Sequence, residues 1–261
     1  MKREFAAALR CPFCRGPLGG LREDACDERE VREGEIACTG CARRFPIRGG
    51  IVHLIDPEDR TIAREVAGWE RMAGPLGDGL EPVMTALPWY PHRPWPETAP
   101  DFFQILEEVD FAGRRVIAIG AGRTWSSRFL ATIGRAAEVV AVDVLTRRYL
   151  GLETADLFFA ADRSFFERLC ADAHRLPLAD GWADAVFSVA SIHHSSDLDG
   201  LFAEIARVLR PGGVLVFVSE PGRSGRSASR RFCSSRETNI AHLTIVVPES
   251  TSSFSKALIS S

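Results

Sequence analysis

Five short apolar runs constrain the fold of this chain more than any other feature of its sequence. Each run is nearly continuous rather than alternating, which is typical of parallel strands covered on both faces of a sheet. Segments with helical periodicity separate them. The sequence therefore predicts an α/β fold with a doubly wound, mostly parallel sheet, whose ligand site lies at the carboxyl ends of the strands. The expected strands are residues 116–120, 139–143, 167–172, 184–190 and 214–220.

Two helices can be predicted from the hydrophobic pattern. One covers residues 61–74, and the other precedes the last strand, where apolar residues recur every 3.6 positions. Ser196 is expected to cap the second helix, and the sequence Arg-Pro-Gly-Gly at 210–213 to end it. Its apolar face consists of Leu198, Leu201, Phe202, Ile205, Val208 and Leu209.

Four of the seven cysteines form two C-x-x-C pairs, separated by 23 residues. Two residues between thiolates let a tight turn present both sulfurs to one ion, and two such turns complete a tetrahedral shell of the kind that zinc accepts. A closed shell leaves no open position, so we expect a structural zinc. The ligands are Cys11, Cys14, Cys38 and Cys41. Cys26, Cys170 and Cys233 have no partner at ligand spacing and are expected to be free thiols.

The cysteine-bearing stretch at residues 9–55 resembles the small zinc-ribbon proteins that activate tRNA and ribosomal methyltransferases. A ribbon ahead of an α/β domain is also similar to ribosomal RNA guanine methyltransferases with an N-terminal zinc finger. The resemblance implies substrate recognition, or contact with a protein partner, through the ribbon. The alternative is that the ribbon packs on its own chain and stabilises it.

A glycine turn follows the first strand of the expected sheet. Gly120 and Gly122 fit the start of a G-x-G-x-x-G pattern, but its third position is Trp125. That bulky residue argues against NAD, whose pyrophosphate requires close packing of helix and strand. S-adenosylmethionine needs only close backbone approach and a helix N-terminus. Asp143 ends the second strand, where a carboxylate can accept both ribose hydroxyls.

Two further stretches, Asp-Ala-His-Arg-Leu-Pro at 172–177 and Arg-Val-Leu-Arg-Pro-Gly-Gly at 207–213, resemble class I S-adenosylmethionine-dependent methyltransferases, with their Rossmann-like fold. The resemblance covers residues 113–221. It implies that the cofactor is bound by Gly120, Ala121 and Gly122 at its methionine half, by Asp143 at the ribose, and by Asp172 with the Ala173 amide at the adenine.

The chain departs from this family at two positions of the turn. Ala118 stands where an acidic residue is usual, and Thr124 where a glycine is. A non-catalytic binding or partner-activating protein that keeps the cofactor fold is therefore the alternative to an enzyme.

His193 and His194 follow the fourth strand, at the rim where a methyl acceptor should lie. A histidine there could accept a proton from the acceptor during transfer. Alternatively, one histidine shapes the pocket and the other caps a turn.

Four segments are expected: a zinc ribbon at 1–59, a helix and proline-rich linker at 60–100, the cofactor-binding domain at 101–221, and a serine-rich basic tail at 222–261 that completes the fold only in part. In the linker, seven prolines predict an irregular path. Its aromatic cluster at 88–96 is expected to pack against the next domain, and the alternative is a lid over a substrate.

The basic excess lies only in the tail, with six basic and two acidic residues after residue 220. This balance lowers the expectation of a nucleic-acid enzyme but leaves the acceptor open between RNA and a small molecule. No apolar run approaches the length of a membrane span, so we expect no membrane contact and a cytoplasmic location.

Overall fold

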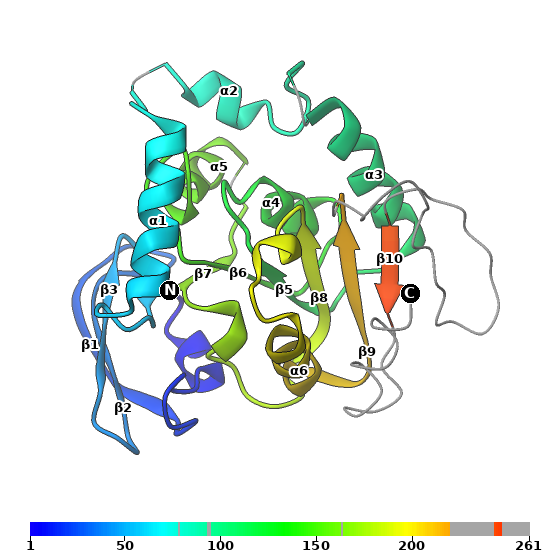
Figure 1. Ribbon diagram of the computed structural model, residues 1–261. Coiled ribbons are helices and arrows are strands. Elements are labelled where there is room, and N and C mark those ends of the chain that lie inside the picture. The colour runs from blue at the N-terminus through cyan, green and yellow to red at the C-terminus, as the bar shows by residue number, and fades with distance from the viewer. Residues whose placement is uncertain (78, 93–94, 163, 220–242, 247–261) are drawn as a thin grey trace.

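The computed structural model describes residues 1–77, 79–92, 95–162, 164–219 and 243–246. Its strands form one sheet of ten, in the order β1-β2-β3-β4-β7-β6-β5-β8-β9-β10 (Figure 1). The strands are β1 Leu18–Cys26, β2 Val31–Cys38, β3 Arg44–Arg48, β4 Ile51–His53, β5 Arg115–Ile119, β6 Glu138–Asp143, β7 Glu167–Cys170, β8 Ala183–Val189, β9 Leu209–Val218 and β10 Leu243–Val246. The α-helices are α1 Arg60–Ala73, α2 Glu81–Thr85, α3 Trp95–Glu108, α4 Trp125–Thr132, α5 Ala155–Asp162 and α6 Leu198–Val208. Short 3-10 helices are η1 Glu4–Ala8, η2 Leu152–Thr154, η3 Ala173–Arg175 and η4 Ile192–His194.

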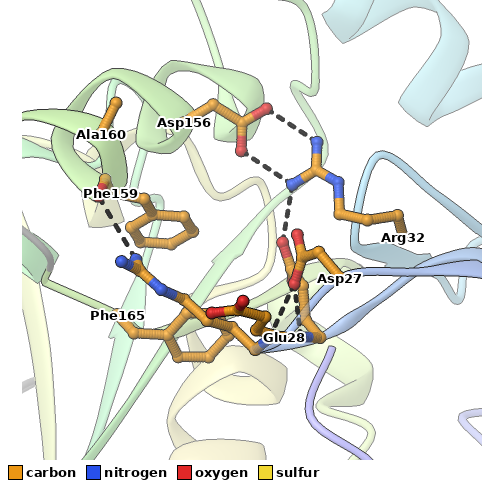
Figure 2. Close-up of a pocket in the computed structure, with 9 residues that line it drawn as sticks. Asp27, Glu28, Arg32, Asp156, Phe159, Ala160 and Phe165 are labelled. Atoms are coloured by element: carbon orange, nitrogen blue, oxygen red, sulfur yellow. Dashed lines mark hydrogen bonds and ion pairs between the residues drawn. The ribbon is translucent and has the colours of Figure 1, made fainter.

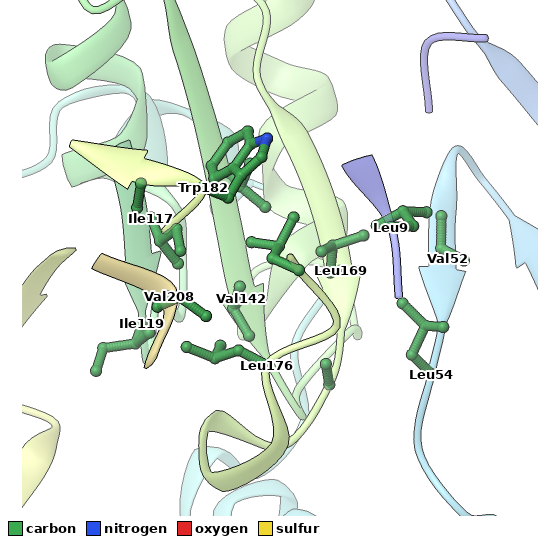
Figure 3. Packing of buried hydrophobic residues seen from close by; sticks show 14 of the residues in the cluster. Leu9, Val52, Leu54, Ile117, Ile119, Val142, Leu169, Leu176, Trp182 and Val208 are labelled. Carbon is green, nitrogen blue, oxygen red and sulfur yellow. The ribbon is translucent and has the colours of Figure 1, made fainter. Parts of the chain in front are cut away.

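Six neighbouring strands, β4, β7, β6, β5, β8 and β9, run parallel. This arrangement confirms the predicted sheet. Successive residues of β5 enter opposite cores. Ile117 and Ile119 share a cluster with Val208 of α6 (Figure 3) and with η1, whereas Val116 and Ala118 share one with α3, α4 and α5. Because both faces are covered, the central strands are mostly apolar rather than alternating between apolar and polar residues.

The helix α6 ends at Val208, before the Arg-Pro-Gly-Gly stretch, as predicted. Its cap, however, is Asp197 and not Ser196, so that prediction was wrong. The Asp197 carboxylate accepts a hydrogen bond from the Gly200 amide at 2.9 Å. The neighbouring Ser195 hydroxyl is used differently, since it accepts from the Asp197 amide at 3.1 Å.

The proline-rich stretch is more regular than predicted. It contains α2 and the start of α3, because Pro82 stands in the first turn of α2 and Pro96 at the start of α3, where a helix needs no amide donor. Its aromatic residues pack on the α/β domain as expected. Trp89 stacks on Phe103 with ring centroids 5.1 Å apart, and Trp95 contacts Trp125 edge to face.

The cysteine-bearing segment extends the parallel sheet. Strands β1 to β4 pair antiparallel with one another, and β4 then pairs parallel with β7. The Leu54 amide continues the pairing and donates to the Cys170 carbonyl at 2.8 Å. Leu9 and Leu54 share one hydrophobic cluster with Leu169 and Leu176 (Figure 3). The ribbon and the α/β domain therefore share a sheet and a core.

Buried charges meet at the seam between ribbon and domain. Arg168 of β7 is fully buried, and its guanidinium contacts Glu30 at 2.7 Å and Asp156 at 2.8 Å. Arg32 of β2 bonds both Asp156 carboxylate oxygens at 3.1 Å and Glu30 at 2.6 Å. Figure 2 shows the Arg32–Asp156 pair beside a cavity of about 340 Å³ that Phe159 and Phe165 also line. Oppositely charged partners thus come from both sides of the seam.

The last described strand, β10, pairs antiparallel with β9 and lies at the end of the sheet. The serine-rich residues 222–242 and 247–261, with Cys233, lie outside the described residues. No helix in the described part of the chain is both long and apolar enough to cross a membrane.

We expect Arg168→Met to lower the free energy of unfolding by about 3 kcal/mol, the low end for a broken buried ion pair, because it removes the buried cation from Glu30 and Asp156 and leaves Arg32 as the side-chain cation that contacts both. Urea unfolding, followed by tryptophan fluorescence and circular dichroism, measures the change. Arg22→Met is the matched control: Arg22 pairs with Asp24 on the surface, and its loss should cost about 1 kcal/mol or less. Equal effects of the two substitutions would contradict the structural role of the seam.

Candidate functional site

The carboxyl ends of β5, β6, β7 and β8 meet at one edge of the sheet, as Figure 1 shows for the neighbouring strands. The turn after β5 has left-handed backbone at Gly120, Gly122 and Thr124, with φ of 58°, 47° and 60°. Glycine adopts this conformation without penalty, whereas Thr124 is strained by about 1–2 kcal/mol. The turn directs the chain from β5 into α4.

The two glycines of the turn have different surroundings. A Cβ at Gly120 would overlap the Ser191 hydroxyl, which follows β8. A Cβ at Gly122 would meet nothing within 4 Å. Gly120 therefore allows β5 and the segment after β8 to approach each other, and Gly122 leaves open space where a ligand could approach the backbone. Ala121, between them, is buried in the core.

Asp143 stands at the end of β6 and faces this turn. Its carboxylate accepts hydrogen bonds from the Gly122 amide at 2.7 Å and the Leu145 amide at 2.8 Å. Burial raises the pKa of Asp143 to about 6. The negative charge of Glu65 on α1 also raises this pKa, whereas the hydrogen bonds from the two amides favour the charged form and lower it. The carboxylate is thus fixed in orientation and sensitive to pH.

Asp172 lies two residues beyond Cys170, which pairs with Asp143, so the two aspartates occupy adjoining strand ends. Its Oδ1 accepts from the His174 amide at 2.9 Å and contacts His174 Nδ1 at 2.7 Å. The other ring nitrogen of His174 lies 2.8 Å from the Ser195 hydroxyl. Burial opposes ionisation of Asp172, but hydrogen bonds from His174 lower its pKa, while Asp172 raises that of His174. A protonated His174 would therefore link the segment after β7 to the segment after β8.

His193 and His194 are exposed in η4, with ring centroids 4.0 Å apart. His194 also packs edge to face against Trp69 of α1, at 5.3 Å. The helix α1 therefore reaches both rims of the site, since Glu65 acts on Asp143 and Trp69 contacts His194. None of its residues is fully buried. This helix was predicted from the sequence, but its position at the site was not.

The four paired cysteines come together as predicted. Their sulfurs all lie within 4.8 Å of one another. Cys11 and Cys41 are 3.7 Å apart, and Cys14 and Cys38 are 3.4 Å apart. A tetrahedral zinc with bonds near 2.3 Å would place its sulfurs about 3.8 Å apart. The set therefore fits one tetrahedral ion, and amides of Gly40 and Cys41 point at the Cys38 sulfur at 3.3 and 3.4 Å.

Comparison with known proteins agrees with this geometry. Residues 117–217 match the family described as "Methyltransferase domain", and residues 2–50 match the family described as "Trm112p-like protein". Over residues 117–217 the chain is thus similar to a methyltransferase domain. The matched stretch runs from β5 to β9, and the Trm112p-like stretch contains all four paired cysteines.

Curated relatives of the methyltransferase domain include a malonyl-[acyl-carrier protein] O-methyltransferase of Methylovorus sp., 34% identical over 43% of this chain and 38% of that protein. A fatty-acid O-methyltransferase of Mycolicibacterium smegmatis is 32% identical over 42% of this chain and 38% of that protein. The chain thus spans about two fifths of the length of these relatives. Among solved structures, a complex of the Haloferax volcanii Trm112 methyltransferase activator with a methyltransferase matches over 54% of this chain and 56% of that one, with 22% identity and a TM-score of 0.41.

The structure brings most of the predicted site residues to one edge. Asp143 contacts Gly122, and Asp172, Ala173, His193 and His194 follow the neighbouring strands. The paired cysteines form a separate cluster in the ribbon. Sequence reasoning missed five residues of the edge. Ser191 and Ser195 gave no signal because serine is common in loops, and Glu65 and Trp69 lay on a helix with no apparent link to the site. The missed residues are Glu65, Trp69, His174, Ser191 and Ser195.

We expect Gly120→Ala to destabilise the fold more than Gly122→Ala, although both positions have positive φ. Strain alone costs about 1–2 kcal/mol at either site, and only Gly120 adds the overlap with Ser191. Thermal unfolding of the two variants measures the difference. Ser191→Gly should recover part of the loss in the Gly120→Ala background but none in the Gly122→Ala background. Equal losses would show that Ser191 does not restrict this turn.

Proposed function

We propose that this chain is an S-adenosylmethionine-dependent methyltransferase with a structural zinc in its ribbon. One observation carries the proposal: Asp143 and Asp172 lie at adjoining strand ends, next to a glycine turn whose amide orients Asp143. The matched methyltransferase domain supports the same reading. The arrangement suits an adenosine group, since one carboxylate can accept from the ribose hydroxyls and the other from the adenine amino group.

Different residues of this edge would bind different parts of the cofactor. Asp143 keeps lone pairs for the ribose beyond those used by its two amides. Asp172 uses Oδ1 for His174, which leaves Oδ2 and the Ala173 amide to bind the adenine. Backbone at Gly120, Ala121 and Gly122 would border the methionine half. When bound, the cofactor supplies a methyl group on an already activated sulfonium, so the protein mainly aligns donor and acceptor and excludes water.

For the acceptor we propose a small molecule with a carboxylate oxygen. The relatives that methylate malonyl-[acyl-carrier protein] and fatty acids favour this class. A carboxylate is already ionised near neutral pH and needs no general base. The acidic excess of residues 61–220, with fifteen basic and twenty-two acidic side chains, disfavours RNA as the acceptor.

His193 and His194 would then shape the acceptor site. Unchanged turnover in His193→Ala and His194→Ala would contradict an acid–base role.

A non-catalytic binding protein is the second candidate. Ala118 leaves no carboxylate at its position in β5, and Thr124 takes up backbone strain in the turn with its hydroxyl buried and unpaired among the described residues. Such a protein would bind the cofactor without transferring its methyl group. A screen with radiolabelled methyl donor against fatty acids, acyl-carrier proteins and RNA separates the two candidates.

We expect S-adenosylhomocysteine to bind, and its affinity to depend on Asp143. The ribose hydroxyls donate to the ionised carboxylate, and the pKa of Asp143 is about 6. The affinity should therefore fall as pH drops from about 7 to about 5, and level off above. Asp143→Asn should weaken binding roughly 10- to 150-fold at neutral pH, because one charge-assisted hydrogen bond is lost. It should also make the affinity less dependent on pH between about 5 and about 7, because asparagine does not ionise.

Titration calorimetry measures this binding. Circular dichroism checks that Asp143→Asn remains folded, and the exposed Asp199→Asn on α6 is the matched control. An affinity that is the same for wild type and Asp143→Asn at every pH would contradict the assigned role of Asp143.

We expect protein purified without added metal to contain about one zinc ion per chain, as a closed four-thiolate site requires. Cys14→Ser should reduce the metal content, whereas Cys26→Ser, outside the cluster, should not. Elemental analysis by mass spectrometry measures both. A content near zero in the wild type would contradict the zinc assignment.

A further inference from the structure

The ribbon holds both ends of the segment that carries Asp172. Before it, the Leu54 amide of the ribbon donates to the Cys170 carbonyl at 2.8 Å. After it, the Arg10 amide donates to the Pro177 carbonyl at 2.9 Å, and Leu9 forms an isolated bridge with Leu178. Residues 171–175 therefore span two points that are both fixed by the ribbon.

The second of these points is adjacent to the first cysteine pair. Leu9 and Arg10 directly precede Cys11, and Arg15 directly follows Cys14. Arg15 adopts a left-handed conformation, with φ of 62°, and its amide donates to the Cys11 carbonyl at 2.9 Å. A non-glycine residue takes this conformation only when its surroundings impose it. The geometry of the knuckle thus sets the direction of the Arg15 side chain.

From the knuckle, Arg15 reaches across to α6 and to the segment after β7. Its guanidinium bonds both carboxylate oxygens of Glu204, at 2.8 and 2.9 Å, and the Leu176 carbonyl at 3.2 Å. The Glu204 side chain is only 6% exposed. A bidentate pair at a largely buried carboxylate fixes both distance and orientation.

Glu204 also positions a second arginine, Arg207 of α6, against the segment after β7. Arg207 bonds the Glu204 carboxylate at 2.8 and 2.9 Å, and donates to the Leu176 and Leu178 carbonyls, each at 2.9 Å. Three consecutive carbonyls, from Leu176 to Leu178, are thus held by the ribbon or by Arg207. We call Arg15, Glu204 and Arg207 the knuckle clamp.

We propose that the knuckle clamp makes the zinc ribbon a positioning element for cofactor binding, because it fixes residues 171–175 in the place where Asp172 meets adenosine. The identity of the ligand in this proposal rests on the proposed function. The fixing of residues 171–175 by the clamp does not depend on it. Arg15 and Glu204 are positioning residues, since they lie behind the segment and act through Asp172.

The test compares Arg15→Met with Arg43→Met in the full chain. Arg43 belongs to the second knuckle, is exposed, and lies over the Phe13 ring at 4.0 Å. Amide hydrogen exchange is measured without ligand, and S-adenosylhomocysteine affinity by calorimetry. Arg15→Met should speed exchange at residues 172–178 by tenfold or more and weaken binding roughly tenfold, with zinc content unchanged, whereas Arg43→Met should change neither. Glu204→Gln should behave as Arg15→Met.

A zinc-depletion cycle tests whether the metal acts through this clamp. Removing zinc with a chelator should weaken ligand binding in the wild type, and should have a much smaller additional effect in Arg15→Met, because the link is already broken. Circular dichroism confirms that both proteins stay folded. Full additivity of the two losses would overturn the proposal, as would faster exchange spread evenly over the sheet.

The two readouts separate failure of this inference from failure of the proposed function. If the wild type does not bind S-adenosylhomocysteine, the proposed function fails, and the positioning role toward a cofactor fails with it. If the wild type binds, but Arg15→Met leaves exchange at 172–178 and affinity unchanged, only the knuckle clamp is refuted.

Discussion

The parallel pairing of β4 with β7 is the interaction on which the rest of this structure depends. All four residues of β7 are buried, so this strand would be a poor edge for the sheet, with unpaired amides and no water to satisfy them. The ribbon supplies the missing neighbour through Val52 and His53. Since Asp172 lies two residues beyond β7, the same pairing that closes the sheet also fixes one end of the proposed cofactor site.

The charges at the seam explain why the pairing has a single register. Arg168 needs acceptors from both sides: Glu30 and the Gly49 carbonyl from the ribbon, and Asp156 from α5. A slip of one residue would turn Arg168 to the other face and leave its charge unpaired in the core, which costs several kcal/mol. Gly50 contributes by lacking a side chain, because a Cβ there would overlap the Glu30 carboxylate. The buried ions therefore specify alignment more than they add stability.

The sequence was sufficient for features that depend on local pattern: the apolar strands, the paired cysteines, the glycine turn and Asp143 at the end of β6. It was insufficient where distant segments decide the outcome. Glu167 and Arg168 look like surface residues of a strand end, yet both are buried because the ribbon provides partners. The approach of Ser191 to Gly120 joins residues far apart in the chain, and no spacing rule encodes it. Asp197 replaced Ser196 as a cap because two adjacent residues could both serve, and only the backbone conformation selects one.

The two halves of the candidate site differ in how firmly they are held, and this difference bears on acceptor choice. The proposed adenosine side, around Asp143 and Asp172, is anchored by sheet pairing, buried ions and the knuckle clamp, so it can be rigid before a ligand arrives. The proposed acceptor side is bordered by η4 and by α1, which contacts the domain through Trp69 but buries none of its residues fully. Few buried contacts mean a low cost of local rearrangement. Substitutions of Trp69 on α1 should therefore alter acceptor preference while leaving adenosine binding intact, because Trp69 contacts His194, whereas the ribbon positions Asp172.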